Sequence, residues 1–358
     1  MRLDHVGIEV RDLFTEELFY RTALGFVPRY RYVSRNTPGL RTVFLERDGL
    51  ALELLERPRE AEFLERRAHA PDHLALAVPD VDAEYARLSA LAFPGARLKP
   101  PRDTGDGYRE LELTDPEGNV VELSARIRAE PRSPVRAVIF DVDGILLDSE
   151  ENYYLADARL LERYGIPFTR EDKRRYVGGG NLDMMVDLRR RFALPETAEE
   201  LVARKNALYL ELARGRTEVY PKMRRLLDRV RARGVPVAAA SGSSPAVLRT
   251  LLEATGLASD LPVAVSAEDV RRGKPAPDVF EEAARRLGVP PHECVAVEDS
   301  HHGVEAAKRA FMACIAVPYF TDRPLDPRVA MADLLFEGGM ERFDEERAFA
   351  WIEARLGT

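Results

Sequence analysis

Two pairs of carboxylates stand out in the second half of the chain: Asp141 with Asp143, and Glu298 with Asp299. Each pair follows a short apolar run that has the length and composition of a buried strand. Ligands bind at the carboxyl ends of strands in an open α/β sheet, so these side chains are expected at one edge. Crowded carboxylates repel one another unless a cation or a proton compensates, and Mg²⁺ is the usual oxygen-binding ion. The pattern therefore predicts a Mg²⁺ site.

A hydroxyl and an amine are expected at the same edge. Ser241 ends the apolar run 235–240, and Lys274 lies in a loop just before a helix that starts near Asp278. With a phosphate ester as substrate this set makes chemical sense. One aspartate attacks phosphorus, Mg²⁺ and the lysine neutralise the oxygens, and the second aspartate moves the proton.

Four segments resemble, in order, the four motifs of the haloacid dehalogenase-like hydrolases: residues 140–149 (FDVDGILLDS), 241–244 (SGSS), 273–275 (GKP) and 298–304 (EDSHHGV). The resemblance covers about residues 135–320 and implies a doubly wound parallel sheet. It also implies that Asp141 is the nucleophile that forms an aspartyl-phosphate and that Asp143 is the general acid/base. Ser241 and Lys274 would then hold the phosphoryl oxygens.

The same resemblance implies the ligands. Mg²⁺ would lie between Asp141, the backbone carbonyl of Asp143, and Asp299, with Glu298 close by. The substrate would be a small phosphorylated metabolite, and we assign three residues to its binding: Gly242, Ser243 and Asn181.

Residues 152–217 have a helical pattern throughout and are expected to form a cap inserted between the first two motifs. This position is similar to that in the branch containing β-phosphoglucomutase and many small-molecule phosphatases. Phosphomutases of this branch carry a histidine where this chain has Tyr153, and an arginine near the position of Asn181, in the loop 178–181. Both departures favour hydrolysis, and a phosphomutase is the alternative.

The basic run 173–175 (KRR), just before this loop, has two interpretations. It could form the substrate-facing edge of the cap. It could equally be a solvated basic helix end followed by glycines.

The first 126 residues contain an internal repeat. The segment 4–10 (DHVGIEV) is echoed by 72–78 (DHLALAV), so that His5 and His73 are 68 residues apart, and Glu53 and Glu122 are 69 apart. We interpret this as a duplicated module, each copy a strand, a helix and three further strands. A pseudo-twofold pairing of the copies would bring two imidazoles and two carboxylates into one cavity, a sound donor set for a divalent transition metal.

This repeat resembles the vicinal oxygen chelate superfamily, which includes glyoxalase I. The resemblance rests on residues 3–13, on 19–26 and on 115–123 (DPEGNVVEL). It implies a metal (Ni, Zn, Co, Mn or Fe) that binds adjacent substrate oxygens and stabilises an enediolate, as in a lyase or isomerase, with a ligand glutamate acting as base. The alternative is a non-catalytic module that binds small molecules. The glyoxalase-like fold often pairs its modules across subunits, so a homodimer is also an expectation.

The domain organisation follows from these patterns. Residues 1–126 form a glyoxalase-like α+β domain, 127–134 a linker with two prolines, and 135–358 a domain in which apolar runs alternate with helical patterns. Alternating strands and helices predict a parallel sheet covered on both faces. We therefore predict a fusion of two enzymes whose substrates are related.

Composition excludes several classes of protein. The chain has 358 residues, 45% of them hydrophobic and 32% charged, which is typical of globular domains rather than disorder. The formal net charge of −8 argues against a nucleic-acid or anionic-membrane partner. The first residues do not form a signal peptide, and no apolar run approaches the roughly 18 residues of a membrane span, so we expect a cytoplasmic protein.

Overall fold

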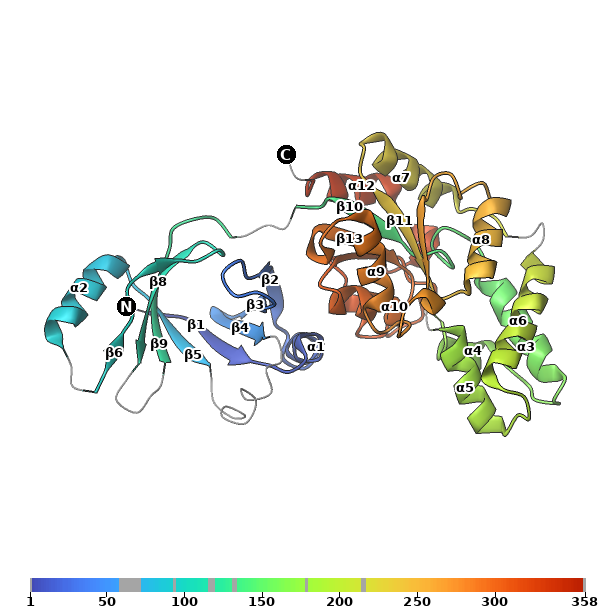
Figure 1. The fold of residues 1–358 in the computed structure, drawn as a ribbon, viewed down its shortest axis with the longest axis horizontal. Coiled ribbons are helices and arrows are strands. Elements are labelled where there is room, and N and C mark those ends of the chain that lie inside the picture. The colour runs from blue at the N-terminus through green and yellow to red at the C-terminus, as the bar shows by residue number, and fades with distance from the viewer. Residues whose placement is uncertain are drawn as a thin grey trace. The chain divides into compact units, whose positions relative to one another are not determined.

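The computed structural model describes residues 2–57, 72–92, 95–114, 120–130, 134–177, 180–213 and 217–356. The chain divides into two compact units, Met1–Ser133 and Pro134–Thr358 (Figure 1). Residues 131–133 of the expected linker lie outside the described residues.

The N-terminal unit is one curved, mixed sheet with a helix from each repeat. The first repeat contributes β1 (Arg2–Glu9), α1 (Leu13–Leu24), β2 (Val27–Val33), β3 (Arg41–Arg47) and β4 (Leu50–Glu56). The second contributes β5 (His73–Ala77), α2 (Val81–Leu91), β6 (Arg97–Leu98), β7 (Arg102–Asp103), β8 (Tyr108–Thr114) and β9 (Val120–Arg126). The strand order is β2-β3-β4-β1-β5-β9-β8-β6, with β7 also on β8.

The two repeats meet along their first strands. β1 pairs antiparallel with β5, while each of them pairs in parallel with the last strand of its own repeat, β4 or β9. One difference from the expected pattern is that two short strands, β6 and β7, stand on β8 where the first repeat has the single strand β2. Both helices start at the aspartates of the repeated turn, because Asp12 and Asp80 accept hydrogen bonds from the backbone N–H groups of Thr15 and Ala83.

The C-terminal unit is built on a six-stranded parallel sheet in the order β12-β11-β10-β13-β14-β15. The strands are β10 (Ala137–Phe140), β11 (Val237–Ser241), β12 (Val263–Ser266), β13 (Cys294–Glu298), β14 (Ala313–Ala316) and β15 (Leu334–Leu335). All residues of the three central strands β10, β11 and β13 are buried. Such strands are uniformly apolar because helices cover both faces of the sheet.

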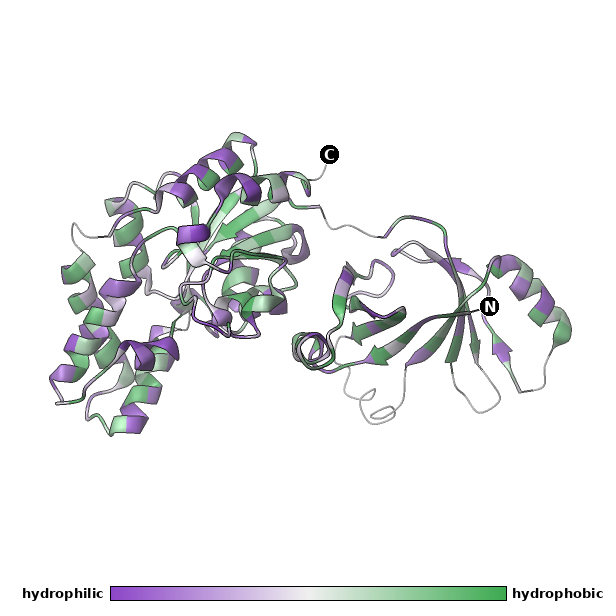
Figure 2. Ribbon diagram, turned by 180° about the vertical axis from the view of Figure 1, so that it is seen from behind, coloured by the Kyte–Doolittle hydropathy of each residue, from purple (hydrophilic) through white to green (hydrophobic). Residues whose placement is uncertain are grey.

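The flanking helices are α7 (Pro221–Ala232), α8 (Pro245–Ala254), α9 (Asp278–Leu287), α10 (His301–Arg309), α11 (Gly339–Arg342) and α12 (Glu345–Glu353). Figure 2 shows the hydrophobic residues gathered in the strands between these helices. The fold class predicted for each part of the chain is confirmed.

Four helices form a cap between β10 and β11: α3 (Glu150–Glu162), α4 (Arg170–Arg174), α5 (Asn181–Phe192) and α6 (Ala198–Ala213). The cap has an apolar core of its own, in which Leu160, Leu161, Met185, Leu188 and Leu201 are fully buried. The cap extends from the sheet (Figure 1), and the bases of α3 and α6 also join the core of the sheet through Tyr153, Ala156 and Tyr209. In the described part of the chain, no helix is long and apolar enough to cross a bilayer.

Candidate active site

The carboxyl ends of the central strands bring a lysine between two buried carboxylates. Lys274 Nζ lies 2.7 Å from Asp141 Oδ1 and 2.6 Å from Glu298 Oε1, and it also donates to the backbone carbonyl of Ala240 at 3.1 Å. Burial raises the pKa of Asp141 well above its usual range, and Lys274 opposes that rise. Burial lowers the pKa of Lys274, but the two carboxylates outweigh it and raise that pKa. Asp141 thus lies beside a fixed positive charge.

Asp141, Glu298 and Asp299 form an acidic cluster in which one oxygen of each lies within 4.8 Å of the others. Glu298 Oε2 accepts hydrogen bonds from the N–H groups of Asp299 and Ser300 and from the Ser300 hydroxyl, at 2.9, 3.0 and 3.1 Å. Asp299 differs, because both of its carboxylate oxygens are buried without a hydrogen-bond partner in the described structure. Burial and Glu298 raise its pKa well above the usual range.

A cation would relieve this arrangement. An unpaired buried carboxylate is unfavourable, and a set of carboxylate oxygens is what Mg²⁺ binds in proteins. The residues present therefore fit Mg²⁺, with Asp299 as the ligand whose oxygens are free and Glu298 as the one already held by its loop.

Two glycines, Gly144 and Gly303, leave the space that the side chains of Asp299 and Glu298 occupy. At Gly144, which has a φ of +79°, a Cβ would lie 2.2 Å from Asp299 Oδ2. At Gly303 a Cβ would lie 1.8 Å from Glu298 Cδ. Both positions require glycine for steric reasons.

Asp143 is held by hydroxyl groups. Its Oδ1 accepts from Ser149 Oγ at 2.7 Å, and its Oδ2 accepts from Ser243 Oγ at 2.8 Å and from Ser241 Oγ at 3.2 Å. Tyr153 on α3 extends this network, with its hydroxyl 2.5 Å from Ser243 Oγ. The two aspartates after β10 therefore occupy different environments, Asp141 beside the lysine and Asp143 among hydroxyls.

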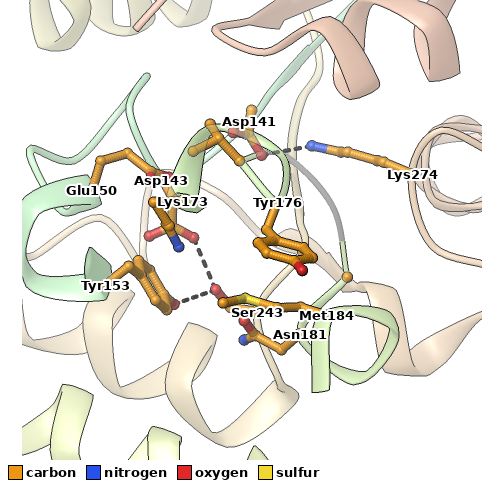
Figure 3. A pocket seen from close by; sticks show the side chains of 13 residues that line it. Asp141, Asp143, Glu150, Tyr153, Lys173, Tyr176, Asn181, Met184, Ser243 and Lys274 are labelled. Atoms are coloured by element: carbon orange, nitrogen blue, oxygen red, sulfur yellow. Dashed lines mark hydrogen bonds and ion pairs between the residues drawn. The ribbon is translucent and has the colours of Figure 1, made fainter. Parts of the chain in front are cut away.

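A pocket lies between this edge of the sheet and the cap (Figure 3). The core lines it with Asp141, Asp143, Gly242, Ser243 and Lys274, and the cap with Glu150, Tyr153, Lys173, Tyr176, Val177, Gly180, Asn181 and Met184. Gly242, Ser243 and Asn181 thus line the same pocket as Asp141, whereas Ser241 is fully buried and is not among the described residues that line it. Gly178 and Gly179 of the cap loop lie outside the described residues.

In the basic run 173–175, the first residue lines the pocket, whereas the other two lie at a partly exposed helix end. Lys173 is buried, lines the pocket and donates to Asp157 Oδ2 at 3.0 Å. Arg174 instead forms ion pairs with Glu171 and Asp322, and Arg175 is exposed.

Several residues that line the pocket or contact its lining were not expected from the sequence. Asp157 also pairs with Lys205, whose Nζ lies 2.7 Å from Asp157 Oδ1, and both residues are completely buried. Burial lowers the pKa of Lys205 to about 8. The local pattern carried no signal for this pair, because charged residues in a helix are usually solvated. For Ser149 and Glu150, the signal was their place at the start of α3, directly after the first motif.

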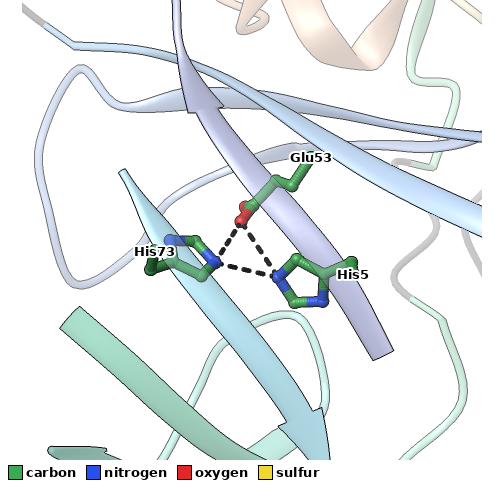
Figure 4. Close-up of side chains that lie close together, drawn as sticks. All are labelled: His5, Glu53 and His73. Atoms are coloured by element: carbon green, nitrogen blue, oxygen red, sulfur yellow. Dashed lines mark hydrogen bonds and ion pairs between the residues drawn. The ribbon is translucent and has the colours of Figure 1, made fainter. Parts of the chain in front are cut away.

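In the N-terminal unit, the repeated histidines face each other. The Nε2 atoms of His5 and His73 are 2.9 Å apart, and Glu53 Oε2 lies 3.5 Å from the first and 3.4 Å from the second (Figure 4). Each Nδ1 lies beside the aspartate that precedes its histidine, Asp4 at 3.0 Å and Asp72 at 3.1 Å. The repeated Asp-His dipeptide therefore supplies both the ligand atom and its supporting carboxylate.

This geometry fits a metal ion. A carboxylate at Nδ1 keeps a proton on that nitrogen, so the two Nε2 atoms, which face each other and Glu53, are the positions where a further proton or a metal ion would bind. Burial lowers the pKa of His5, but the hydrogen bond to Asp4 and the nearby Glu53 raise it to about 10. A positive charge is thus favoured between the rings, and two imidazoles with a carboxylate suit a divalent transition metal.

Glu122, the fourth expected ligand, lines the same cavity but is not in the three-residue cluster. It stands on β9 opposite Glu112 of β8, and burial together with Glu110 raises its pKa to about 8. Residues 115–119, which precede it in the motif, lie outside the described residues. The structure thus joins three of the four expected ligands and leaves Glu122 nearby.

Comparison with known proteins finds a match for each unit. Residues 135–310 match the family model of haloacid dehalogenase-like hydrolases, and residues 2–123 match that of the Glyoxalase/Bleomycin resistance protein/Dioxygenase superfamily.

Individual relatives match the C-terminal half. Hexitol phosphatase B of Escherichia coli (strain K12) is 33% identical over 203 residues, which cover 56% of this chain and 90% of that protein. β-Phosphoglucomutase of Bacillus subtilis (strain 168) is 33% identical over 193 residues, covering 51% and 83%. The crystal structure of CbbY from Rhodobacter sphaeroides in complex with phosphate has a TM-score of 0.51 at 27% identity, covering 58% of this chain and 98% of that one.

Proposed function

Because the chain belongs to the haloacid dehalogenase-like hydrolases and carries a glyoxalase-superfamily domain at its N-terminus, we propose that its C-terminal domain is a Mg²⁺-dependent phosphatase acting on a small phosphorylated metabolite. One observation carries this proposal. Asp141 lies at the end of β10 beside Lys274, next to the unpaired carboxylate of Asp299, and faces the pocket under the cap.

The residues divide the chemistry as follows. Asp141 attacks the phosphorus of the ester, its P–O bond to the leaving alcohol breaks, and an aspartyl-phosphate forms. Asp143 gives its proton to the departing alkoxide and then accepts a proton from the water that hydrolyses the aspartyl-phosphate. Lys274 compensates negative charge on the phosphoryl oxygens throughout.

Magnesium would be held by Asp141 and Asp299, with Glu298 close by and the backbone carbonyl of Asp143 as a further ligand. When bound, it supplies charge neutralisation for the phosphoryl oxygens. The second role of Glu298 is structural, since it fixes both Lys274 and the backbone of its own loop.

The cap residues favour hydrolysis of the aspartyl-phosphate over transfer of its phosphoryl group back to a substrate. Tyr153 stands where phosphomutases of this branch carry a histidine, and it is hydrogen-bonded to Ser243, while Asn181 offers an uncharged amide to the pocket. A phosphomutase must keep a phosphorylated intermediate in its pocket and rebind it, which calls for a strong site for a second phosphate. Because the named relatives include both a phosphatase and a phosphomutase, the phosphomutase is kept as the alternative.

For the N-terminal domain we propose a metal-dependent lyase or isomerase. The convergence of His5, His73 and Glu53 favours it over the alternative of a non-catalytic binding module. A divalent transition metal in this cluster would polarise adjacent oxygens of a substrate, and Glu122 is the nearby carboxyl for moving a proton. Fusion in one chain further suggests that the two domains act on related metabolites.

The phosphatase proposal is tested by measuring inorganic phosphate released from a panel of phosphorylated metabolites, with Mg²⁺ and with a chelator. The Asp141→Asn variant should stay folded and release no phosphate. Undiminished turnover by this variant would contradict the mechanism. Transfer of phosphate between positions of one sugar, without release, would favour the phosphomutase.

A further inference from the structure

The cap side of the pocket faces the part of the substrate that does not react. If Asp141 and Lys274 hold the phosphoryl group at the floor, the remainder of the molecule meets cap residues (Figure 3). The chemistry of the cap residues therefore decides which phosphate esters fit, and two of them, Glu150 and Lys173, have hydrogen-bonding capacity that the described residues leave unused.

Glu150 presents an unsatisfied acceptor. It begins α3, it is only 7% exposed, and its Oε2 is buried without a hydrogen-bond partner in the described structure. Burial raises its pKa to about 7. A buried carboxyl oxygen without a hydrogen-bond donor is unfavourable. A ligand hydroxyl group that donates to it would therefore contribute favourable binding free energy.

Lys173 presents unused donors. Its Nζ makes one hydrogen bond among the described residues, to Asp157 Oδ2, although an ammonium group has three protons to donate. Asp157 holds Lys173 through one oxygen and Lys205 through the other. The Lys173 ammonium is thereby fixed above the Tyr153 ring, 5.4 Å from its centre, at the wall of the pocket.

The charges on this side of the pocket nearly cancel. Lys173 and Lys205 are matched by Asp157 and Glu150, and Asn181 is uncharged. Arg174 is committed to Glu171 and Asp322 and is not among the described residues that line this pocket. A second phosphate or a free carboxylate would find no surplus of positive charge there, whereas hydroxyl groups would find both an acceptor and a donor.

We propose that Glu150 and Lys173 select substrates in which one phosphate is attached to a neutral chain bearing hydroxyl groups, that is, polyol or sugar monophosphates, over bisphosphates and phosphorylated carboxylic acids. This inference rests on the proposed phosphatase function and deepens it. Glu150 accepts a hydrogen bond from one hydroxyl of the substrate, Lys173 donates to another, and Asp157 positions the lysine.

The test compares the full-length, Mg²⁺-loaded enzyme on four probes: glucitol monophosphate, a hexose bisphosphate, phosphoglycerate and p-nitrophenyl phosphate, which has no alcohol hydroxyl groups. The readout is kcat/KM for each probe divided by kcat/KM for p-nitrophenyl phosphate. Wild type should give its highest ratio with glucitol monophosphate. Glu150→Gln and Lys173→Met should each lower that ratio about tenfold, the effect of losing one buried hydrogen bond to a charged group.

The matched control is Glu151→Gln, since Glu151 neighbours Glu150 but forms an exposed ion pair with Arg170. It should leave the ratio unchanged. A higher wild-type ratio for the bisphosphate or for phosphoglycerate would overturn the inference even if both variants failed to fold. Equal losses on glucitol monophosphate and p-nitrophenyl phosphate would also overturn it, because they indicate a structural effect. A wild-type enzyme that releases phosphate from none of the probes would instead contradict the proposed function.

Discussion

The hydroxyl of Tyr153, on the first turn of the cap helix α3, lies 2.5 Å from Ser243 Oγ in the loop that follows β11. Ser243 donates its own proton to Asp143, so Tyr153 is the donor to Ser243. Burial raises the pKa of Tyr153 well above its usual range, which keeps the phenol protonated for this role. The cap is thereby linked to the aspartate proposed to move the proton.

Removing this link should slow the chemical step. We expect Tyr153→Phe to lower kcat for phosphate release about tenfold, because Ser243 would be freed to rotate away from Asp143. KM should change much less, since the variant leaves Lys274 and Asp141 in place. Tyr154→Phe, on the same helix and bonded only weakly to the Phe168 carbonyl at 3.4 Å, is the control. A kcat for Tyr153→Phe equal to that of the control would refute the role.

Replacing Asp299 should raise the stability of the metal-free protein and weaken Mg²⁺ binding. The two carboxylate oxygens of Asp299 have no hydrogen-bond partner among the described residues, and burial disfavours the ionised carboxylate, so Asp299→Asn places there a neutral amide that needs no cation in the metal-free protein. We expect the variant to have a higher Tm than wild type in chelator and to need at least about tenfold more Mg²⁺ for half-maximal activity. Thermal unfolding and Mg²⁺ titration measure the two effects. Activation at the wild-type Mg²⁺ concentration would show that Asp299 is not a ligand.

The N-terminal metal cluster depends on a glycine beside it. Gly7 pairs with His73 across β1 and β5, and a Cβ at Gly7 would lie 2.3 Å from His73 Cε1. Gly7→Ala should therefore displace the His73 ring and lower the transition-metal content per chain measured by elemental mass spectrometry. Phosphate release should stay at the wild-type level, because the two sites lie in different units.

The same measurement ranks the two glutamates. Glu53→Gln should lower the metal content more than Glu122→Gln, because Glu53 Oε2 lies within 3.5 Å of both histidines and Glu122 is outside their cluster. Wild-type protein without a tightly held transition metal would favour the binding module. The reverse ranking of the two variants would mean that Glu122 is the better ligand.

Glu150 should make stability depend on pH. Burial raises its pKa in the folded protein to about 7, above the usual 4.5 of a glutamate, so the folded state holds this proton more tightly than the unfolded state. The free energy of unfolding therefore falls as the pH rises through that interval. Glu150→Gln should not show this loss. The difference in free energy of unfolding between the variant and wild type should therefore be up to about 3 kcal/mol more favourable to the variant at pH 8 than at pH 5. Urea unfolding at the two pH values measures it, with Glu151→Gln as the control. An advantage that does not grow with pH would contradict the assigned pKa.

Local patterns in the sequence were sufficient to predict much of the architecture. The repeat of Asp-His dipeptides predicted a duplicated module, and the structure joins the two copies through β1 and β5, with His5 and His73 facing each other. The strand-end carboxylates predicted the edge of the parallel sheet where Asp141, Lys274 and Glu298 meet. These relationships follow from strand periodicity and topology, which short segments encode.

The cap chemistry could not be predicted in this way. Lys173, Asp157 and Lys205 come from three different helices, and their meeting depends on how α3, α4 and α6 pack. Charged residues in a helix are usually solvated, so nothing in the local pattern distinguished the buried Lys173 from the neighbouring Arg174 and Arg175. Likewise, Glu122 stands opposite Ala75 on β5 as Glu53 stands opposite Gly7 on β1, yet only Glu53 belongs to the histidine cluster, and the spacing of the repeat does not specify which glutamate joins it.

The central claim is that Asp141 forms a covalent bond to the substrate's phosphoryl group. The most direct measurement is a rapid acid quench of the Mg²⁺-loaded enzyme during turnover, followed by mass analysis of the peptide that contains residues 140–149. The account predicts that this peptide gains the mass of one phosphoryl group on Asp141 and that Asp141→Asn neither gains it nor releases phosphate. Full turnover with no modified peptide in wild type, or with a modified peptide in the Asp141→Asn variant, would contradict the account.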